Sequence, residues 1–306
     1  MSLLAWIKGT GPSGFGYRST AEDVTERLDL SDQTFLVTGC NSGLGLETTR
    51  VLARRGATVL GTARTEGKAQ HACESIDGDA VPLVCDLADP SSVRCCVASV
   101  RDRGRPLDAI VANAGVMALP QLQQAYGYER QFFTNHVGHF MLVTGLLDQL
   151  AEHGRVVMLS SSAHTRAPAE GVRFDDLSGD GTYDPWTAYG QSKLANLLFA
   201  RELAGRFQGT GRVANAVHPG VIRTNLARHL HPLLQRALSV ASPLLLKSIP
   251  QGAATQIYAA VHPDAAKLNG EYLVDCNVSA PSQTAHDPHL ASRLWDVTEG
   301  IVSALP

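Results

Sequence analysis

Long apolar runs and dense basic runs are both absent from this chain of 306 residues. No stretch approaches the roughly 18 uninterrupted apolar residues that a membrane-spanning helix needs. The first apolar run, in MSLLAWIKGTGPSGFG, is too short for a signal peptide. Charged residues make up only 18% of the chain and the net charge is −3, so there is no basic field to attract nucleic acid. We therefore expect a cytoplasmic protein without a transmembrane anchor and without a nucleic-acid partner.

Paired metal-ligand motifs are missing as well. The six cysteines show no CxxC spacing, and none of the eleven histidines stands in an HExxH or similar motif. This pattern is typical of reduced thiols in a cytosolic protein and predicts no metal site.

Lysine is scarce: the chain has five lysines, and the other 21 of its 26 basic residues are arginines. One of the five, Lys193, stands four residues after Tyr189 in AYGQSKLANLLFAREL, a stretch with the pattern of a helix. Residues at i and i+4 share one helix face, so the two side chains should lie together. Taken alone, the pair also fits an ordinary helix contact.

Short β-branched runs alternate with longer amphipathic stretches along the chain. The predicted strands are Thr34–Thr38, Ala57–Thr62, Ala80–Cys85, Asp108–Ala112, Arg155–Ser160, Arg212–His218 and Glu271–Val274. The predicted helices are Leu44–Arg55, Pro90–Arg103, Leu122–Leu150, Ala188–Phe207 and Gly252–Val261. This alternation predicts an α/β fold: a single Rossmann-like, doubly wound parallel sheet of about seven strands flanked by helices. Residues 1–30 should form an N-terminal arm, and residues 31–306 one NAD(P)-binding catalytic domain.

A glycine turn joins the first predicted strand to the first helix in TFLVTGCNSGLGLETTRVLARRG. Glycines at this place let the backbone adopt positive φ and approach a pyrophosphate at the helix N-terminus. Packing of the helix on the strand is the alternative explanation for them. The turn predicts cofactor contacts from Gly39, Asn41, Ser42, Gly43, Leu44 and Gly45.

The end of the second predicted strand indicates which dinucleotide binds. An Asp or Glu there usually holds the ribose 2′-hydroxyl of NAD, whereas an Arg accommodates the 2′-phosphate of NADP. The chain reads VLGTARTEGK, with no carboxylate at Thr62 or Ala63 and an arginine at position 64. Arg64 therefore favours NADP(H) over NAD(H), although Glu66 lies close by and a solvated surface arginine would look the same.

Ordered motifs over nearly the whole chain resemble the short-chain dehydrogenase/reductase family. They are TGCNSGLG (38–45), CDLAD (85–89), ANAG (112–115), QFFTNHVGHF (131–140), VVMLSSSAH (156–164), YGQSK (189–193) and HPGVIRTNL (218–226). TNHVGHF and the C-terminal GEYLVDCNVSAPS most resemble the retinol dehydrogenase and WW-domain oxidoreductase branch. GPSGFGYRSTAEDVTERLD also resembles a chloroplast translocon-associated member of that branch. One departure is Ala112, where many members have a second Asn.

The resemblance implies four catalytic roles. Tyr189 would be the acid/base for the substrate oxygen, and Lys193 would hold the nicotinamide ribose and lower the tyrosine pKa. Ser161 would hydrogen-bond the substrate oxygen, with Ser160 and Ser162 as open alternatives. Asn135 would fix a helix kink and support a proton-relay water.

The same resemblance implies further cofactor contacts. They come from the loops that follow the later strands: Asp86, Leu87, Asn113, Ala114, Gly115, Pro219, Gly220, Val221 and Thr224. Tyr189 and Lys193 would contact the cofactor as well.

A charge argument supports the Tyr–Lys pair. A free tyrosine has a pKa near 10, and moving it near 7 takes about 4 kcal/mol. An ammonium ~5 Å away supplies about 3 kcal/mol at an effective dielectric constant near 20. The positive ring of an oxidised nicotinamide could supply the remainder.

The sequence thus predicts an NADP(H)-dependent oxidoreductase acting on an alcohol, aldehyde or ketone. The leucine-rich segment 225–252 stands where the family has its substrate lid, which favours lipophilic substrates unless its leucines only pack on the core. A cofactor-binding regulatory or assembly subunit with little turnover is the alternative, and a homo-oligomer is an open possibility.

Overall fold

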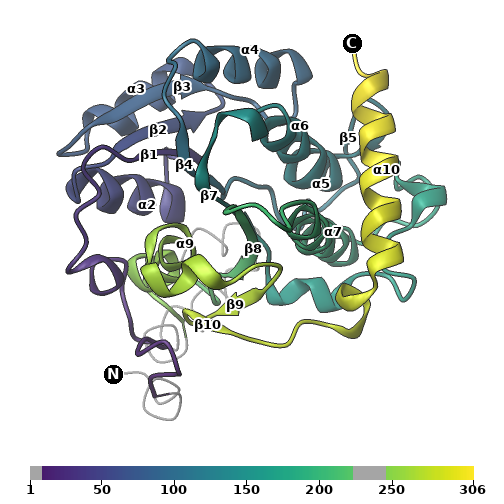
Figure 1. Ribbon diagram of the computed structural model, residues 1–306. Coiled ribbons are helices and arrows are strands. Elements are labelled where there is room, and N and C mark those ends of the chain that lie inside the picture. The colour runs from purple at the N-terminus through teal and green to yellow at the C-terminus, as the bar shows by residue number, and fades with distance from the viewer. Residues whose placement is uncertain (1–8, 223–245) are drawn as a thin grey trace, which may run out of the picture.

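The computed structural model describes residues 9–222 and 246–306. In these two segments, eight strands form one sheet in the order β10-β9-β8-β7-β4-β1-β2-β3 (Figure 1). The strands are β1 (Thr34–Thr38), β2 (Thr58–Ala63), β3 (Ala80–Val84), β4 (Leu107–Ala112), β7 (Leu150–Leu159), β8 (Val213–His218), β9 (Tyr272–Val274) and β10 (Asn277–Val278). All neighbours pair in parallel except β9 and β10. The seven predicted strands are therefore confirmed, and β10 adds a short antiparallel edge.

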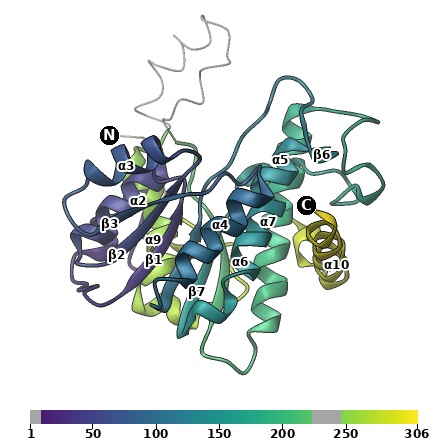
Figure 2. The ribbon, with the colours of Figure 1, turned by 90° about the horizontal axis from the view of Figure 1, so that it is seen from above.

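Helices cover both faces of the sheet. They are α2 (Gly43–Arg54), α3 (Glu66–Glu74), α4 (Pro90–Arg101), α5 (Arg130–Phe132), α6 (Gly138–Thr144), α7 (Pro185–Arg206), α9 (Ile249–Val261) and α10 (Pro288–Ala304). Helices α2 and α9 lie on one side of the sheet, and α4, α6 and α7 lie on the other (Figure 2). Helix α10 packs on the outside of α7 (Figures 1 and 2).

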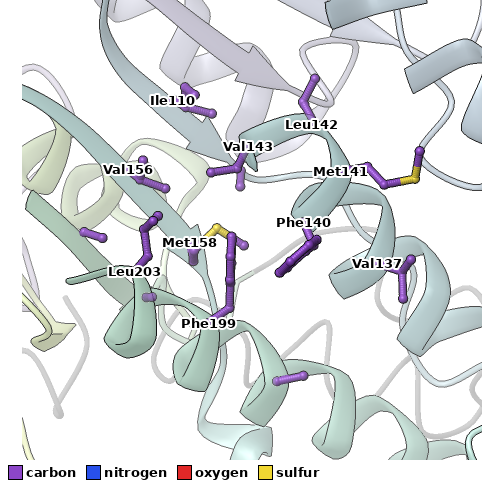
Figure 3. Packing of buried hydrophobic residues seen from close by; sticks show 14 of the residues in the cluster. Ile110, Val137, Phe140, Met141, Leu142, Val143, Val156, Met158, Phe199 and Leu203 are labelled. Carbon is purple, nitrogen blue, oxygen red and sulfur yellow. The ribbon is translucent and has the colours of Figure 1, made fainter. Parts of the chain in front are cut away.

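The larger hydrophobic cluster fills the layer between the sheet and helices α6 and α7. Figure 3 shows Phe140 of α6 facing Phe199 of α7, with Met158 of β7 beside them. Phe140 and Phe199 have ring centroids 5.2 Å apart, and Trp295 of α10 closes the aromatic group 4.9 Å from Phe140. This packing fixes the position of α7, the helix that carries the Tyr–Lys pair.

The helix predicted over Leu122–Leu150 is wrong at both ends. The segment starts with a hairpin of β5 (Gln124–Ala125) and β6 (Tyr128–Glu129), because Tyr126 and Gly127 both adopt positive φ in a two-residue turn. Helix α5 then begins after Glu129, whose carboxylate accepts hydrogen bonds from the Gln131 and Phe132 amides. A five-residue π-helical turn, Phe133–Val137, joins α5 to α6. Leu150 already belongs to β7, which is longer than predicted.

The N-terminal segment packs on the sheet's helices. Residues 9–30 contain one short 3-10 helix (Asp23–Thr25) and pack against α9 and α2 through buried Ala21, Val24 and Leu30. Helices α3 and α10 were not predicted. Short 3-10 turns occupy Leu147–Gln149, Ser162–Arg166, Phe174–Asp176, Pro263–Lys267 and Gln283–His286.

Candidate active site

A cavity of about 330 Å³ opens where the strand order changes direction, at the carboxyl ends of β1 and β4. In an open α/β sheet this switch point is where ligands bind, because the loops on its two sides diverge. The cavity is lined by the residues that follow five strands: Gly39, Asn41, Ser42, Leu44, Ala63, Arg64, Cys85, Asp86, Leu87, Ala88, Asn113, Ala114, Gly115, Val116, Arg130, Thr134 and Leu159. Ten of the predicted cofactor residues are among them.

The glycines of the turn after β1 do two different jobs. Gly39 and Gly43 adopt φ of +75° and +57°, which side chains rarely tolerate. Gly45 instead permits close packing, because an added Cβ would collide with the Gly39 carbonyl oxygen and lie 2.7 Å from Asn113 Nδ2. The two explanations offered for the glycines therefore both apply.

The N-terminus of α2 has the features of an anion-binding site. Ser42 is its N-cap residue, and the Ser42 side chain makes no capping hydrogen bond. Both Ser42 and Leu44 line the cavity, so the free amides of the first helical turn lie at its wall. A pyrophosphate fits this arrangement of positive φ, free amides and helix dipole.

Arg64 lines the cavity at the end of β2. It is exposed, it follows β2 directly, and it makes no ion pair with any residue of the described segments. Glu66 does not pair with it but opens helix α3. The guanidinium of Arg64 therefore remains available to a ligand.

The loop after β4 is tied to the end of β1. Asn113 Nδ2 donates to the Thr38 carbonyl at 2.8 Å, and the amides of Asn113 and Ala114 both donate to Thr38 Oγ1 at 2.9 Å. Gly115 lies so close to Asn135 that an added Cβ would stand 2.9 Å from Asn135 Oδ1. The loop that lines the cavity is thus anchored on both sides.

Helix α7 presents Tyr189 and Lys193. Asp184 caps the helix by accepting from the Thr187 amide, and Pro185 occupies the first turn. The Lys193 ammonium lies 5.7 Å from the centroid of the Tyr189 ring and donates to the Leu159 carbonyl at 2.9 Å. The ammonium thus lies beside Leu159 and Gly115, which line the cavity, whereas Lys193, Tyr189 and Ser161 are not themselves among the lining residues.

Burial dominates the acid–base properties of this pair. It raises the pKa of Tyr189 to about 12, against which a hydrogen bond with the Ser161 side chain acts. Burial also lowers the pKa of Lys193 to about 8. The direction for Tyr189 is opposite to that expected from the charge of Lys193, since the cost of burying a phenolate exceeds the attraction.

The three consecutive serines have separate surroundings. Ser160 is buried and donates to the Lys193 carbonyl at 2.8 Å, so its hydroxyl is committed to the backbone of α7. Ser162 is exposed. Ser161 is the one whose side chain acts on Tyr189, lowering the pKa of that tyrosine against the effect of burial, and its Oγ also accepts from the Ala163 amide.

Asn135 lies in the π-helical turn, and every polar atom of its side chain is hydrogen-bonded. Its Oδ1 accepts from the Val116 amide at 2.8 Å, while its Nδ2 donates to the Val116 carbonyl and to Ser192 Oγ. Ser192 Oγ in turn donates to the Tyr189 carbonyl at 2.8 Å. A π-turn of this kind often marks a functional site.

The residues expected at the nicotinamide end are only partly described. Pro219, Gly220 and Val221 follow β8 and are not among the residues that line the cavity. Thr224 and positions 225–245 of the predicted lid lie outside the described residues. Residues 249–252 of that segment form the first turn of α9.

Several contacts were not anticipated from the sequence. Thr38 and Ser192 lie inside two of the motifs and Arg130 directly precedes a third, but their contacts with the cavity loops and with Asn135 were not predicted. Within residues 9–222 and 246–306, no group of three or more His, Cys, Asp and Glu side chains could hold a metal ion. The helices of this same part of the chain include none with the length and apolar character to span a bilayer.

Comparison with known proteins gives consistent matches. Residues 33–174 match the family model described as short chain dehydrogenase. The chain is 42% identical over its full length to the whole of Short-chain dehydrogenase TIC 32 B, chloroplastic, from Brassica napus. It is 40% identical to Retinol dehydrogenase 12 of Mus musculus, with 90% of this chain and 87% of that protein aligned.

Solved structures show the same architecture. A protein from Mycobacterium paratuberculosis matches with a TM-score of 0.76 and 33% identity over 92% of this chain and 97% of its own. A short chain dehydrogenase from Burkholderia cenocepacia, in complex with NADP, matches with a TM-score of 0.65 and 25% identity, over 80% of this chain and 97% of its own.

Proposed function

Because this chain belongs to the short chain dehydrogenase family of oxidoreductases, we propose that it reduces a lipophilic aldehyde or ketone with NADPH, with Tyr189 as the proton donor. The observation that carries the proposal is the grouping of Ser161 and Lys193 around Tyr189, with the Lys193 ammonium 5.7 Å from the tyrosine ring and bonded to the carbonyl of Leu159, which lines the cavity. A cofactor-binding regulator would need the cavity but not this trio, so the alternative is not favoured.

The cavity supports the cofactor part of the proposal. The glycine turn and the free amides of α2 would hold the pyrophosphate, and Arg64 would face the 2′-phosphate of NADP. The bound nicotinamide supplies the hydride. Lys193 and the loop residues Asn113–Gly115 would hold the nucleoside nearest to the reacting carbon.

Proton delivery falls to Tyr189. A tyrosine with a pKa of about 12 is protonated at neutral pH, which suits donation to a carbonyl oxygen better than abstraction from an alcohol. The Ser161 hydroxyl would orient that oxygen.

A lipophilic substrate is suggested by the rim above Tyr189. Trp186 lies one helical turn before Tyr189 and is 39% exposed. The centroids of the two rings are 6.3 Å apart, and the rings are nearly perpendicular. Apolar burial contributes roughly 25 cal/mol per Å², so such a wall favours a hydrophobic substrate. The relative named for retinol agrees with this class.

The location we propose is the cytoplasm, since the six cysteines of the described segments are free thiols.

The first test is a panel of aldehydes and ketones of rising chain length, with a polar sugar as control, run with NADPH and NADH. We expect kcat/KM to rise with chain length and to be higher with NADPH. A flat profile or a preference for the sugar would refute the substrate class.

The second test is Tyr189→Phe. The substitution removes the proton donor but little binding surface, so turnover should fall by at least about a thousandfold while NADPH affinity stays nearly unchanged. Single-turnover kinetics and a fluorescence titration with NADPH measure the two quantities. Substantial turnover by the variant would show that another group donates the proton.

A further inference from the structure

His139 is a fully buried imidazole with no assigned role. It lies on α6, one turn after Asn135, and is 0% exposed. Both ring nitrogens have partners: Nε2 is 2.9 Å from Thr38 Oγ1, and Nδ1 is 2.8 Å from the Asn135 carbonyl oxygen. The ring thus lies between the end of β1 and the π-turn that carries Asn135.

The hydrogen-bond partners of Thr38 fix the direction of these bonds. Its Oγ1 already accepts from the amides of Asn113 and Ala114, so the hydroxyl has only its own proton left to give. The nearest acceptor is His139 Nε2 at 2.9 Å, against 3.5 Å for the Val111 carbonyl. Nε2 therefore accepts, the ring proton sits on Nδ1, and Nδ1 donates to the Asn135 carbonyl.

The ring stays neutral in this position. Burial, followed by the charge of Lys193, lowers the pKa of His139 to about 4. A neutral ring with one fixed tautomer can act as a rigid spacer that accepts on one side and donates on the other. No proton needs to move through it.

We propose that His139 is a positioning residue that holds the cofactor loop Asn113–Gly115 and the π-turn at Asn135 at a fixed separation. This inference rests on the proposed function, because the π-turn connects to Tyr189 through Asn135 and Ser192, but its cofactor-loop half depends only on dinucleotide binding. The bond to Thr38 sets the loop amides, and the bond to the Asn135 carbonyl sets the π-turn. Each half should be separable by substitution.

Two variants separate the halves. In His139→Asn the side-chain amide stands near the place of Nδ1 and can still donate to Asn135, but nothing remains to accept from Thr38. In His139→Gln the amide oxygen reaches the place of Nε2 and can accept from Thr38, whereas the donor to Asn135 is lost. Since one such hydrogen bond changes an equilibrium about fivefold to tenfold, His139→Asn should weaken NADPH binding by that factor with little change in kcat. His139→Gln should reduce kcat by a similar factor with little change in NADPH affinity.

His136 provides a matched control. It is also fully buried, three residues earlier in the π-turn, but its Nε2 pairs with Thr298 Oγ1 of α10, away from the cavity. His136→Asn and His136→Gln should lower the melting temperature without changing NADPH affinity or kcat. If the His139 variants behave like these controls, with both parameters within twofold of the unmodified protein, the proposal is wrong.

Two measurements cover variants that fail to fold. Thr38→Val removes the bond to His139 together with the two bonds from the loop amides and should weaken NADPH binding more than His139→Asn does, whereas Thr38→Ser should retain affinity. In the unmodified protein labelled with ¹⁵N-histidine, NMR should show His139 protonated at Nδ1 and not at Nε2 between pH 6 and 8; protonation at Nε2 would overturn the inferred direction. If no carbonyl compound is turned over at all, the proposed function fails, yet NADPH titration of His139→Asn against His139→Gln, together with the tautomer, still decides the cofactor-loop half.

Discussion

Lys193 is 3% exposed, and burial of its ammonium lowers its pKa to about 8. From its usual value of 10.5, this shift corresponds to up to about 3 kcal/mol of destabilisation of the folded state. Because the folded pKa is depressed, the cost is full below pH 8, where both states carry the charge, and it fades as the pH rises from 8 to 10.5. The position of Lys193 therefore destabilises the folded protein, as is common for residues at functional sites.

Lys193→Met should therefore stabilise the protein while it abolishes turnover. We expect the free energy of unfolding to rise by about 1–3 kcal/mol at pH 7, with the gain shrinking between pH 8 and 10. Denaturant unfolding at several pH values measures it. Lys267→Met, which replaces an exposed lysine, serves as the control and should change little. A loss of stability in Lys193→Met would mean that the bond to Leu159 outweighs the burial of the charge.

We expect the choice of cofactor to depend on Arg64. Arg64→Asp replaces a phosphate partner by a carboxylate, which repels the 2′-phosphate and can accept from a ribose hydroxyl. The ratio of kcat/KM for NADPH to that for NADH should fall by at least about tenfold. Arg103→Asp, on the surface away from the cavity, is a charge-matched control. Equal or better use of NADH by the unmodified protein would contradict the argument.

At the scale of elements, glycines in two helices should respond in opposite ways to substitution by alanine. Gly45 in α2 touches the Gly39 carbonyl and Asn113, whereas Gly300 in α10 is exposed with open space around it. Gly300→Ala should raise the free energy of unfolding by about 0.5–1 kcal/mol, because alanine favours a helix. Gly45→Ala should lower it by about 1–3 kcal/mol and weaken NADPH binding, since the turn must move aside. Thermal unfolding and cofactor titration compare the pair; similar effects of the two would refute the packing role of Gly45.

At the scale of the whole molecule, the N-terminal arm is fastened to α2 by one carboxylate. Glu22 forms ion pairs with Arg50 at 2.9 Å, Arg54 at 3.1 Å and Arg55 at 3.0 Å. All four side chains are partly exposed, so screening reduces what these pairs contribute. Glu22→Gln should lower the free energy of unfolding by about 1 kcal/mol, and less at high salt. Glu26→Gln, on an exposed neighbour without an ion pair in the described segments, should have no comparable effect.

Much of this molecule follows from its local sequence. Alternating apolar runs were enough to predict the seven parallel strands, and the turn at Gly39 with the motif at Tyr189 was enough to indicate the site. Signals that were present but not used include Asp287 followed by Pro288 at the start of α10. The helix predicted over Leu122–Leu150 is interrupted by a turn at Tyr126 and Gly127. Tyrosine rarely adopts positive φ, so its presence there did not indicate a turn.

What the sequence by itself determined is the seven parallel strands, four of the helices that join them and the motifs that carry the candidate groups, because these depend on residues a few positions apart. Only the tertiary structure decided how those groups behave. Burial reversed the expected shift of the Tyr189 pKa, and the surroundings separated Ser161 from its two neighbours. The bond between Thr38 and His139 joins residues 101 positions apart. Such contacts depend on how the chain packs, and no pattern within either segment encodes the distance between them.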